Sequence, residues 1–140
     1  MDTKLQNNQG LVVMVSTVYS LRLSEHLKSA ESLLEAKDYV QAGEKVWGAL
    51  TALVNSRFDP EAHGVDVKES RFRSLFVRYE GVEPNLRKRM KQLNFRDVGE
   101  LFKSIYSLHK YFYGGTSYNA TLISRNIEFF IQLITELSKQ

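Results

Sequence analysis

The sequence predicts an all-α protein that folds as an antiparallel bundle of four to five helices. Apolar residues recur every three or four positions along most of the chain, which is the spacing of a helix face rather than of a strand. Only Pro60 and Pro84 interrupt the chain, so few positions are barred from a helix interior. The stretch from Asp38 to Val54 begins with a capping residue and continues as an amphipathic pattern rich in small residues.

Size and composition limit the class of protein. A chain of 140 residues is about one domain, and we expect residues 1–10 to form a flexible arm before a single helical domain at 11–140. The absence of cysteine excludes disulfides, thiolate metal sites and a cysteine nucleophile. No apolar run approaches the ~18 residues of a membrane-spanning helix, and the N-terminus does not resemble a signal peptide. We therefore expect a cytoplasmic protein without a membrane partner.

The first two helices are predicted to form a hairpin. Residues 11–18 are rich in β-branched valine and would also suit a strand, but the apolar series continues at helical spacing to Leu34, which favours a long helix. After a short break, Asp38 and Gln41 are spaced as an N-cap pair for the second helix. A short connection between two helices implies that they run antiparallel.

The remaining helix boundaries follow from local signals. Residues 55–66 should form a loop, and Asp66 with Glu69 should mark the start of a further helix. Pro84 suits a first helical turn, and Asp97 with Glu100 should start the next helix, which ends at Gly114-Gly115. A last helix presents one apolar face made of Ile123, Ile127, Phe130, Ile131, Ile134 and Leu137.

Two stretches resemble a known group of proteins. Ala36 to Leu50 reads AKDYVQAGEKVWGAL, and His109 to Gly115 reads HKYFYGG. Together they resemble archaeal paREP-type proteins of the HEPN-like superfamily, and the resemblance covers roughly Leu23 to Leu137. It implies a four- or five-helix antiparallel bundle that is commonly paired as a homodimer. Other branches of that superfamily are ribonucleases, toxins, or partners of nucleotidyltransferases.

The nuclease branches of this superfamily carry an arginine and a histidine separated by four to six residues. Neither His26 nor His109 has an arginine at that distance, whereas Arg57 and His63 enclose five residues. Phe58 replaces the polar residue usual after the arginine, and the match lies after the second helix rather than near the last. We therefore interpret it as a chance match, which argues against an enzyme.

Charge is concentrated in one segment. Nine basic residues and three glutamates lie between Lys68 and Arg96, so this segment carries +6 while the rest of the chain carries −3. Clustered arginine and lysine attract phosphate groups, although a solvated basic helix explains the pattern equally well. The predicted phosphate- or nucleic-acid-binding residues are Arg71, Arg73, Arg78, Arg87, Lys88, Arg89 and Lys91.

Aromatic residues surround the Gly114-Gly115 turn. We expect His109 to sit at the edge of the buried face, where a structural histidine is more common than a catalytic one. If the chain has a pocket, it should lie where His109 and Tyr113 approach the basic segment, because tyrosine rings hold bases and phosphates. Catalytic residues are not expected, and Arg57, His63 and His109 are only weak candidates.

The preferred prediction is a HEPN-like binding or interaction module without cofactor or metal, acting as a homodimer. Its expected partner is RNA, a nucleotide, or a nucleotide-handling protein of the nucleotidyltransferase type. The alternative is a metal-independent ribonuclease, in which histidine is the general base and arginine stabilises the developing phosphorane charge. A tetratricopeptide-like hairpin is disfavoured, because no second copy follows at the repeat spacing.

Overall fold

The structure is a computed structural model that describes residues 3–77, 84–114 and 119–139, with side chains at 17–76, 87–110 and 119–139. Within these ranges the chain forms helices and no strand, so the all-α class is confirmed. The helices are α1 (Thr3–Glu35), α2 (Tyr39–Phe58), α3 (Glu69–Val77), α4 (Pro84–Gln92), α5 (Val98–Gly114) and α6 (Ala120–Ser138). These six helices in the described residues exceed the predicted four to five, because the middle region holds two short helices, α3 and α4.

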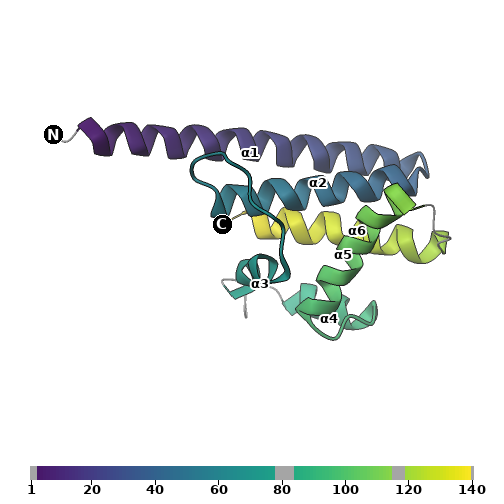
Figure 1. Ribbon diagram of the computed structural model, residues 1–140. Coiled ribbons are helices and arrows are strands. Elements are labelled where there is room, and N and C mark those ends of the chain that lie inside the picture. The colour runs from purple at the N-terminus through teal and green to yellow at the C-terminus, as the bar shows by residue number, and fades with distance from the viewer. Residues whose placement is uncertain (1–2, 78–83, 115–118, 140) are drawn as a thin grey trace.

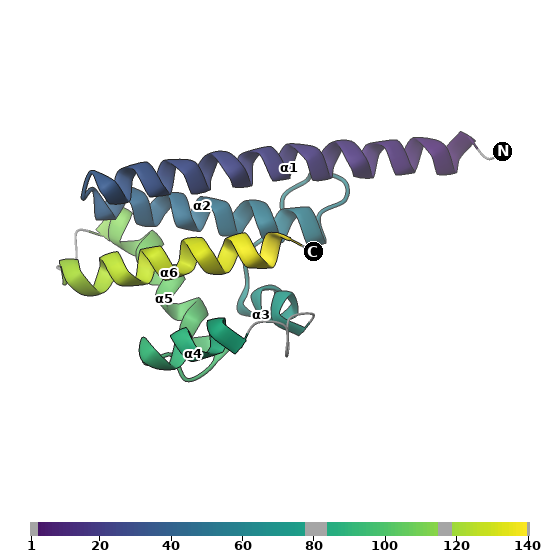
Figure 2. The same cartoon turned by 180° about the vertical axis from the view of Figure 1, so that it is seen from behind.

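Three long helices lie side by side in both views of the molecule, in the order α1, α2, α6 (Figures 1 and 2). The hairpin of α1 and α2 is antiparallel, as predicted. Helix α6 runs in the same direction as α2, because α5 crosses the layer obliquely and returns the chain to the end where α2 begins (Figure 1). The bundle is therefore not antiparallel throughout, and α3 and α4 lie near the start of α5.

Helix α1 begins at Thr3, so residues 3–10, which we predicted to be a flexible arm, form its first turns. The valine-rich stretch at 11–18 is also helical, as favoured from the sequence. At its other end, α1 stops in a Schellman motif: the Asp38 N–H donates to the Leu33 carbonyl at 2.9 Å, and the Lys37 N–H donates to the Leu34 carbonyl at 3.0 Å. Lys37 adopts the left-handed conformation that this motif requires, with φ of 62°.

The predicted helix starts are confirmed where a side chain caps them. Asp38 accepts a hydrogen bond from the Gln41 N–H, and Asp97 accepts one from the Glu100 N–H at 2.9 Å. Pro84 is the first residue of α4. The start of α6 was not predicted in detail, and there Asn119 accepts from the Leu122 N–H at 3.0 Å.

The core is built around α2, which packs against α1, α5 and α6. All six residues of the predicted apolar face of α6 are buried, but Phe129 and Leu133 are fully buried as well, so α6 is enclosed on a wider arc than one stripe. Small residues of α2 allow close approach, as the sequence indicated. A Cβ on Gly43 would lie 3.1 Å from the Leu108 Cβ of α5, and one on Gly48 would lie 3.0 Å from the His26 ring of α1.

Candidate functional site

Part of the predicted basic segment is held by carboxylates. Arg73 Nε lies 3.7 Å from Glu69 Oε2 on α3, and Arg96 Nε lies 3.6 Å from Glu100 Oε1 at the start of α5. The tip of Arg73 also packs over Gly99, because a Cβ placed there would lie 2.9 Å from its Nη2 atom. Arg73 therefore attaches α3 to the first turn of α5, and Arg96 attaches the loop before α5 to the same turn.

Two more of the predicted basic residues contact other groups of the fold. Arg71 Nη1 donates to the carbonyl of Asp66 in the loop before α3. The Arg89 guanidinium of α4 lies 5.8 Å from the centre of the Phe129 ring of α6, a cation–π contact that docks α4 onto the core. Both arginine residues are half-buried, which leaves them less available to an external phosphate.

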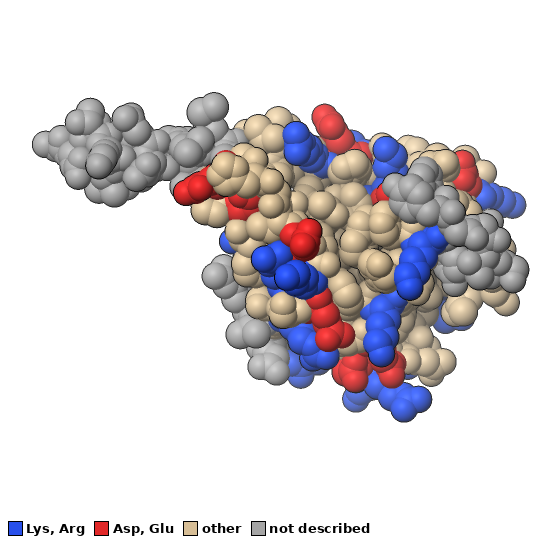
Figure 3. Space-filling model, viewed as in Figure 1, with Lys and Arg blue, Asp and Glu red and all other residues tan. Residues whose placement is uncertain are grey.

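The other predicted binding residues that the structure describes are exposed on α4. Arg87, Lys88 and Lys91 form no ion pair with any residue whose side chain the structure describes. Arg78 lies outside the described residues. On the face shown in Figure 3, basic and acidic side chains are interspersed over much of the lower surface. The basic segment is thus divided between anchored arginines and a smaller exposed group on α4.

A second group of cations lies on α5. Lys103, Tyr106 and Lys110 are all exposed, and their spacing of three and four residues places them along one line of the helix, which we name the α5 stripe. Tyr106 is 40% exposed, a large fraction for an aromatic side chain. The Lys110 ammonium lies 4.9 Å from the centre of its ring. Within the described part of the chain, neither lysine forms an ion pair.

Beside the α5 stripe lies a cluster of aromatic rings from α2 and α5, which we name the Trp47 cluster: Trp47, Phe102, Tyr106 and His109. Trp47 stacks on His109 with 5.0 Å between ring centres, and it meets Tyr106 edge-on at 5.5 Å. Phe102 stacks on Tyr106 at 6.2 Å. Because Tyr106 belongs to both groups, the Trp47 cluster and the α5 stripe are adjacent.

His109 is held in place by α2. Its Nδ1 atom lies 2.9 Å from Glu44 Oε2, and the two side chains are only 27% and 23% exposed. This half-buried pair agrees with the expectation that His109 sits at the edge of the buried face. The predicted pocket of His109 and Tyr113 can be located only at His109, because the Tyr113 side chain lies outside the described residues.

Glu44 also influences the third histidine, His26 of α1. Burial, together with the positive charge of Lys45, lowers the pKa of His26, while Glu25 and Glu44 act in the opposite direction. His26 packs on Gly48, one residue after Trp47. Helix α1 therefore contacts this part of α2 as well. Glu44 and Trp47 thus lie on a part of α2 that has α1 on one side and α5 on the other.

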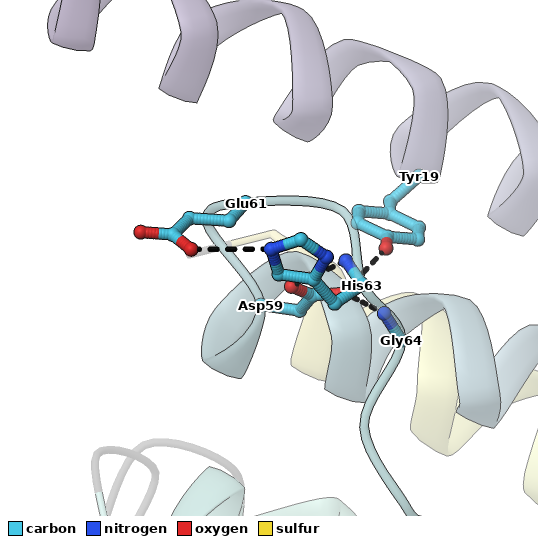
Figure 4. Close-up of polar contacts among 5 residues, drawn as sticks. All are labelled: Tyr19, Asp59, Glu61, His63 and Gly64. Atoms are coloured by element: carbon cyan, nitrogen blue, oxygen red, sulfur yellow. Dashed lines mark hydrogen bonds and ion pairs between the residues drawn. The ribbon is translucent and has the colours of Figure 1, made fainter.

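The arginine and histidine of the nuclease-type spacing engage different parts of the fold. Arg57 Nη2 donates to the Leu137 carbonyl at the end of α6, at 3.4 Å. His63 lies on the loop after α2, and its Nε2 atom is 3.2 Å from Glu61 Oε2, with both side chains more than 70% exposed (Figure 4). These contacts direct one residue to the core and the other to solvent.

Asp59 is the centre of that loop (Figure 4). Its buried carboxylate accepts hydrogen bonds from the Tyr19 hydroxyl at 2.8 Å, from the His63 N–H at 3.0 Å, and from the Gly64 N–H. Burial by itself would raise the pKa of Asp59, but these hydrogen bonds outweigh it and hold the pKa below its ordinary value. Burial raises the pKa of Tyr19, and the hydrogen bond to Asp59 adds to this effect. The carboxylate fastens the loop to α1, which is a structural role.

A model of the archaeal PaREP1/PaREP8 family matches residues 19–126, more than three quarters of the 140 residues. The chain belongs to this family. The matched range contains all of α2 to α5, and so both the α5 stripe and the Trp47 cluster of this PaREP1/PaREP8 member lie within it. Comparisons with curated proteins and with solved structures gave no match.

The described part of this family member holds no group of three or more histidine, aspartate or glutamate residues placed to bind a metal ion. Across the same residues, no helix combines the length and the apolar character needed to cross a membrane.

Sequence reasoning missed the most exposed combination of charge and aromatic surface. Lys103 and Lys110 were not among the predicted binding residues, although their spacing around Tyr106 is visible in the sequence. Glu44 was also missed, and no local signal could have found it, because its partner His109 is 65 residues away along the chain.

Proposed function

We propose that this protein is a binding module that recognises a phosphate-bearing ligand, RNA or a nucleotide, through the α5 stripe. One observation supports the proposal above all others: an exposed aromatic ring, Tyr106, has an exposed lysine on either side of it along the same helix. A tyrosine ring supplies a stacking surface for a base, and lysines attract phosphates. The exposed cations of α4 add to the electropositive field around this site.

The surroundings of Tyr106 support a binding role. Its ring is backed by the Trp47 edge and the Phe102 face, so its orientation is fixed before a ligand arrives. A ring that is already ordered loses little conformational freedom on binding, which favours affinity. Binding needs only this preformed surface, whereas the ribonuclease alternative needs an arginine and a histidine that act on one phosphate. The separate partners of Arg57 and His63 support the binding role over that alternative.

The sole tryptophan of the chain offers a direct test. Trp47 contacts Tyr106, so a ligand on the α5 stripe should change its fluorescence. We would titrate the protein with a six-nucleotide uridylate oligomer, an RNA hairpin and uridine monophosphate, each at several salt concentrations. Two phosphate contacts to a single strand predict a slope of log affinity against log salt of about −1.4.

Variants make this test specific to the α5 stripe. The double substitution Lys103→Gln with Lys110→Gln should weaken binding, whereas Arg125→Gln, which removes an exposed cation from α6, should leave it unchanged. The proposal is wrong if none of the three ligands gives a saturable, salt-dependent signal. A ribonuclease would instead cut labelled RNA without metal, and the cleavage would disappear in His63→Ala or His109→Ala.

We also propose that the chain forms a homodimer in the cytoplasm, as its HEPN-like resemblance implies, and α1 supports this. The N-terminal part of α1 extends beyond the other helices (Figure 1). Where α1 reaches the end of α2, Val18 and Leu21 are 45% and 59% exposed on either side of Tyr19, which donates a hydrogen bond to Asp59. Two exposed apolar residues three apart form one face of the helix, which a second copy would cover. Light scattering should give a dimeric mass for the protein and a monomeric mass for Val18→Glu with Leu21→Glu. A monomeric mass for the unchanged protein would contradict this.

A further inference from the structure

We infer, on the basis of the proposed function, that the ligand of the α5 stripe is an unpaired segment of single-stranded nucleic acid. One base would stack on Tyr106, and the phosphates on its two sides would meet Lys103 and Lys110. Three features of the site favour this class of nucleic acid: the register of the two lysines, the exposure of the Tyr106 ring, and the contact that Lys110 makes with the ring.

The register of the lysines matches a chain of phosphates rather than a single phosphate group. Lys103 lies three residues before Tyr106 and Lys110 four residues after it, so their backbones are about 10 Å apart along α5. A base placed on the ring therefore has a cation on each side. A mononucleotide carries its phosphate on one side only and would use one lysine at a time. The interior nucleotide of a strand uses both.

The ring itself requires an unpaired base. Stacking on Tyr106 needs access to the flat face of a base, and in a duplex each face is covered by the neighbouring pair. The 40% exposed fraction of Tyr106 is available to a base approaching from solvent, while Trp47 and Phe102 occupy its other sides. A duplex could reach the lysines but not the ring.

The present contact of Lys110 shows how the ring is released. Its ammonium lies over the Tyr106 ring at 4.9 Å, held by a cation–π attraction of modest strength for an exposed pair. The lysine side chain is long and flexible, so an arriving base can replace it on the ring. The freed ammonium then binds the adjacent phosphate. Lys110 thus contacts the ring in the free protein and a phosphate in the complex.

The experiment compares ligands and variants in one assay. Dissociation constants are measured by fluorescence anisotropy for a labelled six-nucleotide uridylate oligomer, with an RNA hairpin carrying a similar number of paired phosphates and uridine monophosphate as competitors. We expect the oligomer to bind about ten-fold or more tightly than either competitor. Tyr106→Leu should remove most of this preference and leave residual phosphate binding, while Tyr106→Phe should retain it. Melting curves verify that each variant is folded.

Each outcome separates this inference from the proposed function. If the hairpin binds as well as the oligomer, or Tyr106→Leu keeps the full preference, the single-strand inference is overturned while phosphate recognition stands. If uridine monophosphate binds as tightly as the oligomer, the two lysines do not bind two phosphates of one strand. If no ligand binds with a salt dependence, the proposed function itself fails.

Discussion

Two groups of cations on this molecule differ in what surrounds them. Three arginines, of α3, of α4 and of the residues before α5, are engaged: Arg73 and Arg96 pair with glutamates, and Arg89 packs on Phe129. Lys103 and Lys110, which lie about one and about three turns from the start of α5, form no ion pair within the described residues. If the α5 stripe binds the ligand as proposed, the densest run of positive charge in the sequence does not mark the binding surface.

The difference has an energetic basis. An arginine already paired with a carboxylate must give up that contact, worth up to about 1 kcal/mol at a surface, before it binds a phosphate. The nearby carboxylate also repels the phosphate. Within the described residues Lys103 and Lys110 have no ion pair to give up, and Lys110 gives up only its cation–π contact with Tyr106, so two such lysines next to an exposed ring can outweigh a larger number of arginines held in ion pairs.

The largest effect is expected from removing positive charge from each of the two groups of cations in turn. Lys103→Gln with Lys110→Gln should weaken binding of the uridylate oligomer about 30-fold, since two charge-assisted contacts of about 1 kcal/mol each are lost. Arg73→Gln with Arg96→Gln should change affinity less than about two-fold and lower stability by about 1 kcal/mol, because these ion pairs of four-residue spacing support α3 and the start of α5. Anisotropy and thermal unfolding measure the two quantities on the same samples. If the arginine variant loses more affinity than the lysine variant, the comparison is reversed.

A second pair of variants tests whether the position of α5 matters without changing any charge. Gly43→Ala places a methyl group 3.1 Å from the Leu108 Cβ, which is fixed to the backbone of α5. The expected cost is about 1 kcal/mol net of the gain in helix propensity, with weaker ligand binding as α5 shifts.

Gly48→Ala is the matched control on the same helix. Its nearest neighbour is the ring of His26, a movable side chain, so we expect stability to be unchanged or higher by up to about 1 kcal/mol. Urea unfolding of both variants measures the difference. Equal destabilisation would show that the two helix contacts are equally rigid, contrary to this account.

The last effect is the pH dependence of stability that Asp59 causes. It sets the pH range in which binding by the two groups of cations can be compared. The folded state lowers the pKa of Asp59, so its contribution to stability is present above the ordinary value of 3.8 and is lost as the pH falls through the lower folded-state value. Thermal unfolding of the protein should show this loss at acid pH, and Asp59→Asn should show less of it. Binding is therefore best measured between about pH 5 and 8. A stability profile that is unchanged in Asp59→Asn would contradict this role.

Much of the fold could be predicted because its signals are local. The caps at Asp38 and Asp97 and the proline at Pro84 act within one helical turn, and the apolar face of α6 is a simple periodic pattern. The direction of α6 relative to α2 could not be predicted, because it depends on how α5 crosses the layer. That crossing is set by contacts such as Gly43 on Leu108, which join residues far apart in the chain.

The candidate site was less accessible to sequence reasoning. The pairs Arg73–Glu69 and Arg96–Glu100 have the four-residue spacing of helix ion pairs, so the engagement of these arginines could have been read from the sequence. The spacing of the α5 stripe could also have been read, but charge counting favoured the denser segment. The Trp47 cluster joins α2 to α5, and only tertiary structure brings it together.

Photo-crosslinking tests the central claim most directly. A six-nucleotide uridylate oligomer containing 4-thiouridine is bound to the protein and irradiated, and the tryptic peptides are mapped by mass spectrometry. Cleavage after Lys103 and Lys110 releases Ser104 to Lys110, which contains Tyr106 and His109. The account predicts that the main crosslink lies in this peptide, with a second in the Trp47 peptide. Crosslinks confined to the peptides of α4 or to residues 92–96 would contradict it and return the site to the basic segment.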